Sequence, residues 1–144
     1  MEVVHKVREL TASAAARMAE AAVARAVELG VAVVVVVVDR GGHPLVLRRM
    51  DGAPTLALTV AEKKARSAVA FPLPTHRWYD LLRESPALLQ NLPQVADLVV
   101  FGGGLPVRVA GEVAGGIGVS GASEAQDTEI ARAGLAAVGA EEDP

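Results

Sequence analysis

The sequence predicts an α+β fold in which a central, mostly antiparallel sheet is flanked by helices. The predicted elements follow the order α-β-β-α-α-β-β-β-α, and the strands fall into two groups separated by helices. Within each group, neighbouring strands are joined by short, glycine-containing turns. Strands grouped in this way favour antiparallel pairing over a doubly wound parallel sheet, which would alternate single strands with helices.

The first helix is predicted from Thr11 or Ser13, both good N-cap residues, to Gly30, a typical residue just after a helix. Its polar side chains lie within about 140° of arc at 100° per residue, and the remainder of its surface is apolar. A helix with so wide an apolar surface is expected to be covered on more than one side.

A continuous apolar run, Val31–Val38, precedes Asp39 and predicts a strand that is buried on both faces. The turn Arg40-Gly41-Gly42-His43 follows, and Pro44–Met50 returns as a second strand. The two strands and the turn predict a β-hairpin.

The second half of the chain begins with a helix over Thr55–Phe71, which Pro72 ends. One or two short helices, broken at Pro86, are expected over residues 75–90. The last helix begins at Ser123, where Ser-x-x-Gln predicts a capping box, and ends near residue 138. Between these helices, three short strands are expected at Leu98–Phe101, Pro106–Val109 and Glu112–Val119.

The 144 residues fit one domain, 1–144, with its core over about residues 10–138. A net charge of −3 and the lack of a basic cluster exclude a nucleic-acid partner. Hydrophobic residues make up 51% but aromatic residues only 3%, so small side chains must form the core and self-association into a homo-oligomer is expected. The absence of cysteine, of a signal peptide and of a membrane-length apolar run favours a cytoplasmic protein without a membrane partner.

Two charged residues interrupt the apolar faces of their helices. Lys64 lies about 140° from the polar side of the second helix, and Asp127 shares an apolar stripe of the last helix. Buried charges need a partner or a ligand. One interpretation is a structural ion pair of these two residues with each other or with Asp39, Arg49 or Asp51. The other is a polar pocket in which Lys64 binds an anionic ligand or acts as an acid or base.

The glycine-rich segments are a second indication of a ligand site or of close packing. Gly102-Gly103-Gly104 either forms a tight turn or offers N–H groups that hold a carboxylate. Gly116-x-Gly118-x-x-Gly121 matches the dinucleotide-binding pattern, but no further strand follows the helix behind it. These glycines are therefore expected to let the first helix or another subunit pack closely on the strand.

Three histidines, His5, His43 and His76, lack zinc-site spacing, although a single histidine can ligate haem iron. Of these, His43 and His76 are the haem-ligand candidates, and His76 stands beside Arg77, Trp78 and Tyr79 at the rim of a possible pocket.

Four segments, in order, resemble the GlcG/HbpS family. They are VVVDRGGHPLVLRRMDGA, KKARSA, GGGLPVRVAGEVAGGIGVSG and SEAQDTEIARAGLAA. The family pattern R-M-D-G-A matches residues 49–53, and K-A-x-T-A matches residues 64–68 with Ser67 in place of Thr. Its G-G-x-P motif and late Asp match Gly103, Gly104, Pro106 and Asp127. The stretch from residue 72 to residue 97 resembles the family least, so Trp78, Tyr79 and Arg83 are expected to influence which ligand binds.

The resemblance implies a profilin-like α+β domain that assembles into oligomers and binds a small molecule, with haem or a corrinoid as possible cofactors. Two alternatives stand beside tetrapyrrole binding. One is a metal-independent enzyme acting on a small anionic substrate, with Lys64 and Asp127 as catalytic residues, and the other is a purely structural oligomer. The predicted ligand-binding residues are Asp39, Arg49, Asp51, Lys64, Gly103, Gly104 and Asp127.

Overall fold

A computed structural model describes residues 1–142, so the last two residues of the predicted domain, Asp143 and Pro144, lie outside the described part. The helices are α1 (Ala12–Leu29), α2 (Leu56–Ala70), the short 3₁₀ helix η1 (Thr75–Arg77), α3 (Trp78–Leu82), α4 (Pro86–Val95) and α5 (Glu124–Ala137). The strands are β1 (Val34–Asp39), β2 (Pro44–Arg49), β3 (Gly104–Val109) and β4 (Glu112–Ser120). The predicted α+β class is confirmed.

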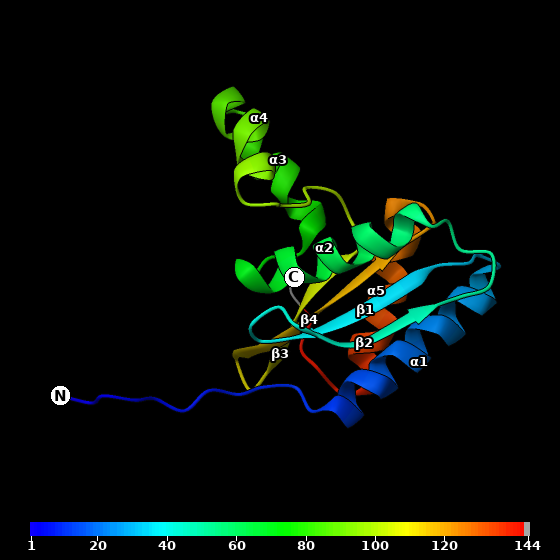
Figure 1. The fold of residues 1–144 in the computed structure, drawn as a ribbon, viewed down its shortest axis with the longest axis horizontal. Helices are drawn as coiled ribbons and strands as arrows, with labels where there is room; N and C mark the ends of the chain where they lie inside the picture. The colour runs from blue at the N-terminus through cyan, green and yellow to red at the C-terminus, as the bar shows by residue number, and fades with distance from the viewer. Residues whose placement is uncertain (143–144) are drawn as a thin grey trace.

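Within residues 1–142, the strands form one sheet in the order β2-β1-β4-β3, and every neighbouring pair is antiparallel. Helix α2 lies on one face, and α1 and α5 pack together on the other (Figure 1). The chain therefore forms three layers, with the sheet in the middle.

Strand β1 is buried on both faces, as its apolar run predicts. Val35 and Val37 belong to the core beneath α1 and α5, whereas Val34, Val36 and Val38 belong to the core beneath α2. Alternate residues of a strand point to opposite faces, so each layer of helices receives its own valines.

The helix ends follow the predicted capping residues. The Thr11 side chain accepts a hydrogen bond from the N–H of Ala14, and Gly30 ends α1 in the left-handed conformation with φ of 71°. At α5, Ser123 and Gln126 form the predicted capping box.

The glycines of β4 serve a different helix from the expected one. A Cβ at Gly118 would overlap the carbonyl oxygen of Ala61, and one at Gly116 would lie 2.6 Å from the carbonyl oxygen of Ala65. Both alanines belong to α2. The prediction that the first helix or another subunit packs there is therefore corrected, since α2 crosses β4 at backbone contact distance.

Of two further predictions between α2 and β3, one is corrected and one is confirmed. Residues 98–101 form no strand, because the N–H of Leu98 donates to the Pro93 carbonyl and that of Val99 to the Ser67 hydroxyl. The predicted break of the short helices at Pro86 is confirmed, since α3 ends at Leu82 and α4 begins at Pro86, where proline at the first position loses no hydrogen bond.

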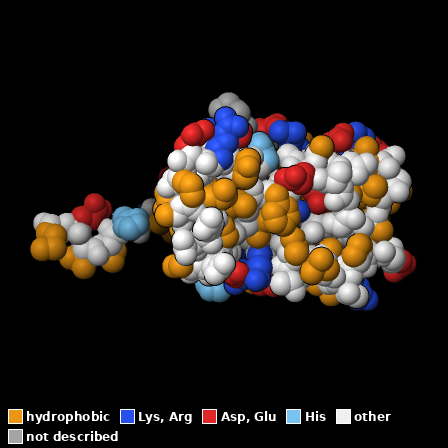
Figure 2. Space-filling view, turned by 90° about the horizontal axis from the view of Figure 1, so that it is seen from above, with side chains coloured by type: hydrophobic (Ala, Val, Ile, Leu, Met, Phe, Trp, Pro, Cys, Tyr) orange, Lys and Arg blue, Asp and Glu red, His pale blue; other side chains and the backbone are white. Residues whose placement is uncertain are grey.

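Helices α3 and α4 project from the body of the molecule, and residues 1–9 extend away from it at another side (Figure 1). Figure 2, which looks onto the side from which α3 and α4 project, shows hydrophobic side chains gathered on that face. No helix among residues 1–142 is long and apolar enough to cross a membrane.

Candidate functional site

Lys64 and Asp127 form a buried ion pair between α2 and α5. The Lys64 ammonium donates to Asp127 Oδ2 at 3.1 Å and to the carbonyl of Val119 at 2.8 Å. The other oxygen of Asp127 accepts the N–H of Ala122 at 3.0 Å. Burial lowers the pKa of Lys64 and raises that of Asp127, while the charge of each partner opposes the shift.

The glycine loop closes over this pair. Gly103, at φ of 126°, lies so near that a Cβ there would stand 2.7 Å from the Lys64 nitrogen. The Phe101 ring centroid lies 5.1 Å from the same nitrogen. Gly102 donates its N–H to Glu124 at 2.7 Å, and Gly104 donates to the Thr75 hydroxyl at 2.9 Å. The loop thus does hold a carboxylate, but it is the chain's own.

The structure does not bring the other predicted ligand-binding residues to Lys64. Asp39 accepts hydrogen bonds from the backbone N–H groups of Gly41 and His43, both at 2.9 Å, and these bonds lower its pKa. Arg49 and Asp51 line a separate hollow of about 320 Å³ beside α1. Of the predicted set, only Lys64, Gly103, Gly104 and Asp127 meet, and none of them lines any of the three cavities described here.

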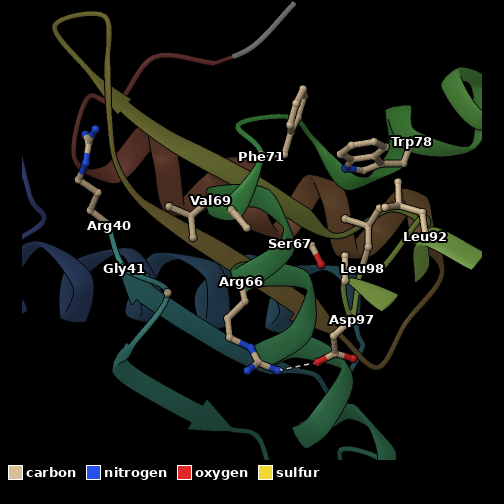
Figure 3. Close-up of a pocket in the computed structure, with 13 residues that line it drawn as sticks. Arg40, Gly41, Arg66, Ser67, Val69, Phe71, Trp78, Leu92, Asp97 and Leu98 are labelled. Carbon is tan, nitrogen blue, oxygen red and sulfur yellow. Dashed lines mark hydrogen bonds and ion pairs between the residues drawn. The ribbon is translucent and has the colours of Figure 1, made fainter. Parts of the chain in front are cut away.

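The largest of these cavities is a cleft of about 580 Å³ between α2, the β1–β2 turn and the α3–α4 projection (Figure 3). Its size falls within the range of about 300–1,000 Å³ that is typical of small-molecule sites. The lining is mostly apolar. The apolar side chains come from the end of α2 and the segments after it, and they are Val69, Ala70, Phe71, Trp78, Leu92, Ala96 and Leu98.

Charged residues stand at the edge of this cleft. In Figure 3, Arg66 of α2 reaches Asp97, which follows α4, through an ion pair of 3.1 Å. Lys63 binds the other oxygen of Asp97 at 2.8 Å. Arg40 stands apart from this pair, on the β1–β2 turn, and donates to the carbonyl of Val113 at 2.6 Å. The cleft therefore combines an apolar interior with cationic groups at its margin.

Trp78 supplies an unusual polar group. The residue is 92% buried, and its indole N–H has no acceptor among the described residues. The ring packs edge-on against Phe71 with centroids 5.2 Å apart. A buried donor without an acceptor is uncommon in proteins and points to a missing partner.

The two candidate histidines lie in different places. His43 does not itself line the cleft, and its side chain is 81% exposed, but its ring lies next to the lining residue Gly41, since a Cβ at Gly41 would lie 2.9 Å from the ring. Its Nδ1 is 3.2 Å from Asp39. His76 lines a smaller cavity of about 240 Å³ with Glu124, Thr128 and Arg132. Burial, and then the charges of Arg132 and Arg77, lower the pKa of His76.

Sequence reasoning found part of this cleft. The segment from residue 72 to residue 97 does contribute Trp78 to the lining, whereas Tyr79 is exposed and Arg83 pairs with its neighbours Asp80 and Glu84. Arg40, Arg66 and Asp97 could not be recognised as cleft residues from the sequence, because their positions fit ordinary solvent-exposed charges.

Comparison with known proteins gives one consistent family. Residues 10–136 match the family model described as "Haem degrading protein HbpS-like". An uncharacterised 15.0 kDa protein from the dhaT–dhaS intergenic region of Citrobacter freundii is 37% identical over 131 residues, which cover 90% of this chain and 92% of that protein.

Solved structures agree with this match. The ORFY protein of Klebsiella pneumoniae superposes with a TM-score of 0.90 at 38% identity, over 99% of both chains. The PduOC chain of a crystallised PduOC–haem complex superposes with a TM-score of 0.87 at 36% identity, over 94% of this chain and 99% of that one.

Proposed function

Because this chain belongs to the HbpS-like family, we propose that it binds haem or a related tetrapyrrole in the cleft between α2, the β1–β2 turn and the α3–α4 projection. One observation carries the proposal, namely an apolar cleft of about 580 Å³ with cationic residues at its margin. A tetrapyrrole with acid side chains is a large, flat, apolar ring with charged groups on its edge, and a cleft of this kind suits both parts.

The two other cavities suit such a ring less well. At about 240 Å³, the hollow beside His76 falls below the usual size of small-molecule sites, and the 320 Å³ hollow beside Arg49 stands at its lower limit. The similarity to a chain that has been crystallised with haem supports the ligand class. A corrinoid, which is also a large ring with polar groups on its edge, stays a candidate for the same cleft.

For an iron-containing ring, His43 is our preferred ligand. Its Nδ1 faces the Asp39 carboxylate, which leaves Nε2 as the nitrogen able to bind iron. A carboxylate that holds the second nitrogen of a histidine is a common way to orient a metal ligand. Bound haem would supply a redox-active iron, while the chain would supply the apolar enclosure and the orientation of the ring.

Titration of the purified protein with haem, followed in the Soret band, tests the proposal. We expect a saturable red shift with a stoichiometry of one haem per chain. The His43→Ala variant should change the Soret position, and His76→Ala should not, because His76 lies in another cavity. A wild-type titration without a saturable shift would contradict haem binding, and equal spectra for His43→Ala and wild type would remove His43 as the ligand.

Three further expectations from the sequence are still predictions. A catalytic role for Lys64 and Asp127 on a small anionic substrate stays a prediction, which turnover assays of the Lys64→Met variant would test. Self-association and a cytoplasmic location are also still predictions, for which light scattering and cell fractionation are the direct measurements.

A further inference from the structure

One residue of the cleft is held in a way that a ligand could change. Arg66 projects from α2 into the margin of the cleft, and its guanidinium is bound by the carboxylate of Asp97 at 3.1 Å. The side chains of both residues are about half exposed, at 44% and 53%, so water screens their attraction. An ion pair of this kind is weak and exchanges readily for another anion.

Asp97 does not depend on Arg66 alone. Its other oxygen binds Lys63 at 2.8 Å, so it keeps a cationic partner when Arg66 turns away. The residue also has a φ of 53°, a left-handed conformation that few residues other than Gly, Asn and Asp adopt. The backbone therefore places the carboxylate at the cleft margin at some conformational cost.

A second observation, independent of Arg66, also points to an acceptor on the ligand. The indole N–H of Trp78 is buried without an acceptor, and Figure 3 shows this ring standing over the cleft with its nitrogen on the side of Ser67. The Phe71 ring, which packs on it, is itself largely exposed. A ligand oxygen near this donor would satisfy it.

We propose that Arg66 selects ligands with a carboxylate, and that this carboxylate replaces Asp97 on the Arg66 guanidinium when the ring enters the cleft. Asp97 then acts as an internal competitor, which keeps Arg66 in place when the cleft is empty and lowers the affinity for rings without an acid group. This inference rests on the proposed tetrapyrrole binding and adds to it which ring the cleft prefers.

Charge determines which rings the cleft prefers. A neutral ring gains apolar contacts only, and it leaves the Arg66–Asp97 pair as it is. A ring with acid groups gains a guanidinium–carboxylate contact, which can form two parallel hydrogen bonds. Because Lys63 stays with Asp97, this gain does not leave an unpaired carboxylate behind.

Two porphyrins without iron separate this inference from haem ligation. Protoporphyrin IX carries two carboxylates, and its dimethyl ester carries none, while their rings are the same. We expect wild-type protein to bind the diacid about tenfold more tightly than the ester, since a charge-assisted contact of this kind amounts to roughly one factor of ten or more in affinity. Quenching of the fluorescence of Trp78, the one tryptophan of the sequence, reports binding.

Variants assign the preference to its residues. Arg66→Gln should weaken binding of the diacid about tenfold and leave the ester within about twofold, because only the acid contact is lost. Asp97→Asn, in which Asn tolerates the same positive φ, should strengthen binding of the diacid severalfold. Arg17→Gln is the matched control, since Arg17 is exposed on α1, on the opposite face of the sheet. Circular dichroism establishes that each variant is folded.

The outcomes are distinguishable. If wild-type protein shows no saturable Soret shift with haem and binds neither porphyrin, the proposed function fails and this inference fails with it. If it binds haem but neither porphyrin, haem binding stands and selection by Arg66 is wrong. If it binds both with equal affinity, or if Arg66→Gln weakens both by the same factor, tetrapyrrole binding stands and selection by Arg66 is wrong. Unchanged or weaker binding of the diacid by Asp97→Asn would remove the role of Asp97 as a competitor.

Discussion

Lys64 is one of the largest side chains that the fold buries completely, and it is charged. Its ammonium has two oxygen partners, the Asp127 carboxylate and the Val119 carbonyl, and these partners offset part of the cost of taking the charge out of water. Through the Val119 carbonyl, the pair joins α2 and α5, which lie on opposite faces of the sheet, to strand β4 of the sheet between them. Losing one member leaves the other as a buried charge without its counterion.

The first prediction concerns this pair. Lys64→Met and Asp127→Asn should each lower the free energy of unfolding by about 3–5 kcal/mol, the usual cost of breaking a buried ion pair. The double variant Lys64→Met/Asp127→Asn should lose less than the sum of the two single variants, because no charge is left behind. Urea denaturation at neutral pH measures all three, with Arg17→Met, at an exposed position of α1, as the control. Single variants as stable as the control would contradict the structural role of the pair.

The second prediction concerns His76. Burial, together with the charges of Arg132 and Arg77, lowers the pKa of His76 below its ordinary value of 6.5, so the fold favours the neutral imidazole. A pKa depressed in the folded state contributes stability that is present above about pH 6.5 and is lost as the pH falls through the folded pKa. NMR titration should place the His76 pKa below 6.5, and Arg132→Gln should raise it. A His76 pKa at or above 6.5 would contradict this environment.

At the scale of elements, the helical periodicity of the sequence identified more of the buried polar residues than the strand patterns did. It identified Lys64 and Asp127 as inward-facing, because a charge on the apolar side of a helix stands out against its neighbours. It could not reveal the cleft, since Arg40, Arg66, Trp78 and Asp97 come from separate segments that only the tertiary fold brings together. The strand wrongly predicted at residues 98–101 has a similar cause, because these apolar residues form a loop that is hydrogen-bonded to Ser67.

The contact between α2 and β4 gives the third prediction. A Cβ at Gly118 would overlap the Ala61 carbonyl oxygen and lie 2.5 Å from the Ala65 nitrogen, and backbone cannot move aside as a side chain can. Gly118→Ala should therefore cost about 1–3 kcal/mol or more through overpacking. Thermal denaturation measures the effect, and Ala24→Ser on the exposed side of α1 is the control. A melting temperature of Gly118→Ala equal to that of the control would show that α2 does not lie against β4 in this way.

For the whole molecule, the three-layer body leaves one part uncovered. Helix α1 is covered on more than one side, as predicted, because it packs against α5 and against β1 and β2, while Val27 on its outer side stays exposed within residues 1–142. Exposed apolar side chains also lie on the α3–α4 projection, at Tyr79, Leu81, Leu88 and Val95. The sequence of α4, PALLQNLPQV, contains no charge, and none of its residues is buried. The apolar face in Figure 2 lies on this side of the molecule.

The fourth prediction follows from that surface. A helix with no charge and with exposed Leu88 and Val95 is unusual on an isolated protein, and contiguous apolar patches often mark contacts with other chains. If the self-association expected from the composition occurs through α4, the variants Leu88→Glu and Val95→Glu should shift the mass measured by light scattering towards that of one chain, 14.8 kDa. Neither residue lines the cleft, so the Soret titration of these variants should match that of wild-type protein if the cleft is complete within one chain. Wild-type protein that is already monomeric at high concentration would contradict self-association, and a variant that keeps its oligomeric mass would place the contact elsewhere.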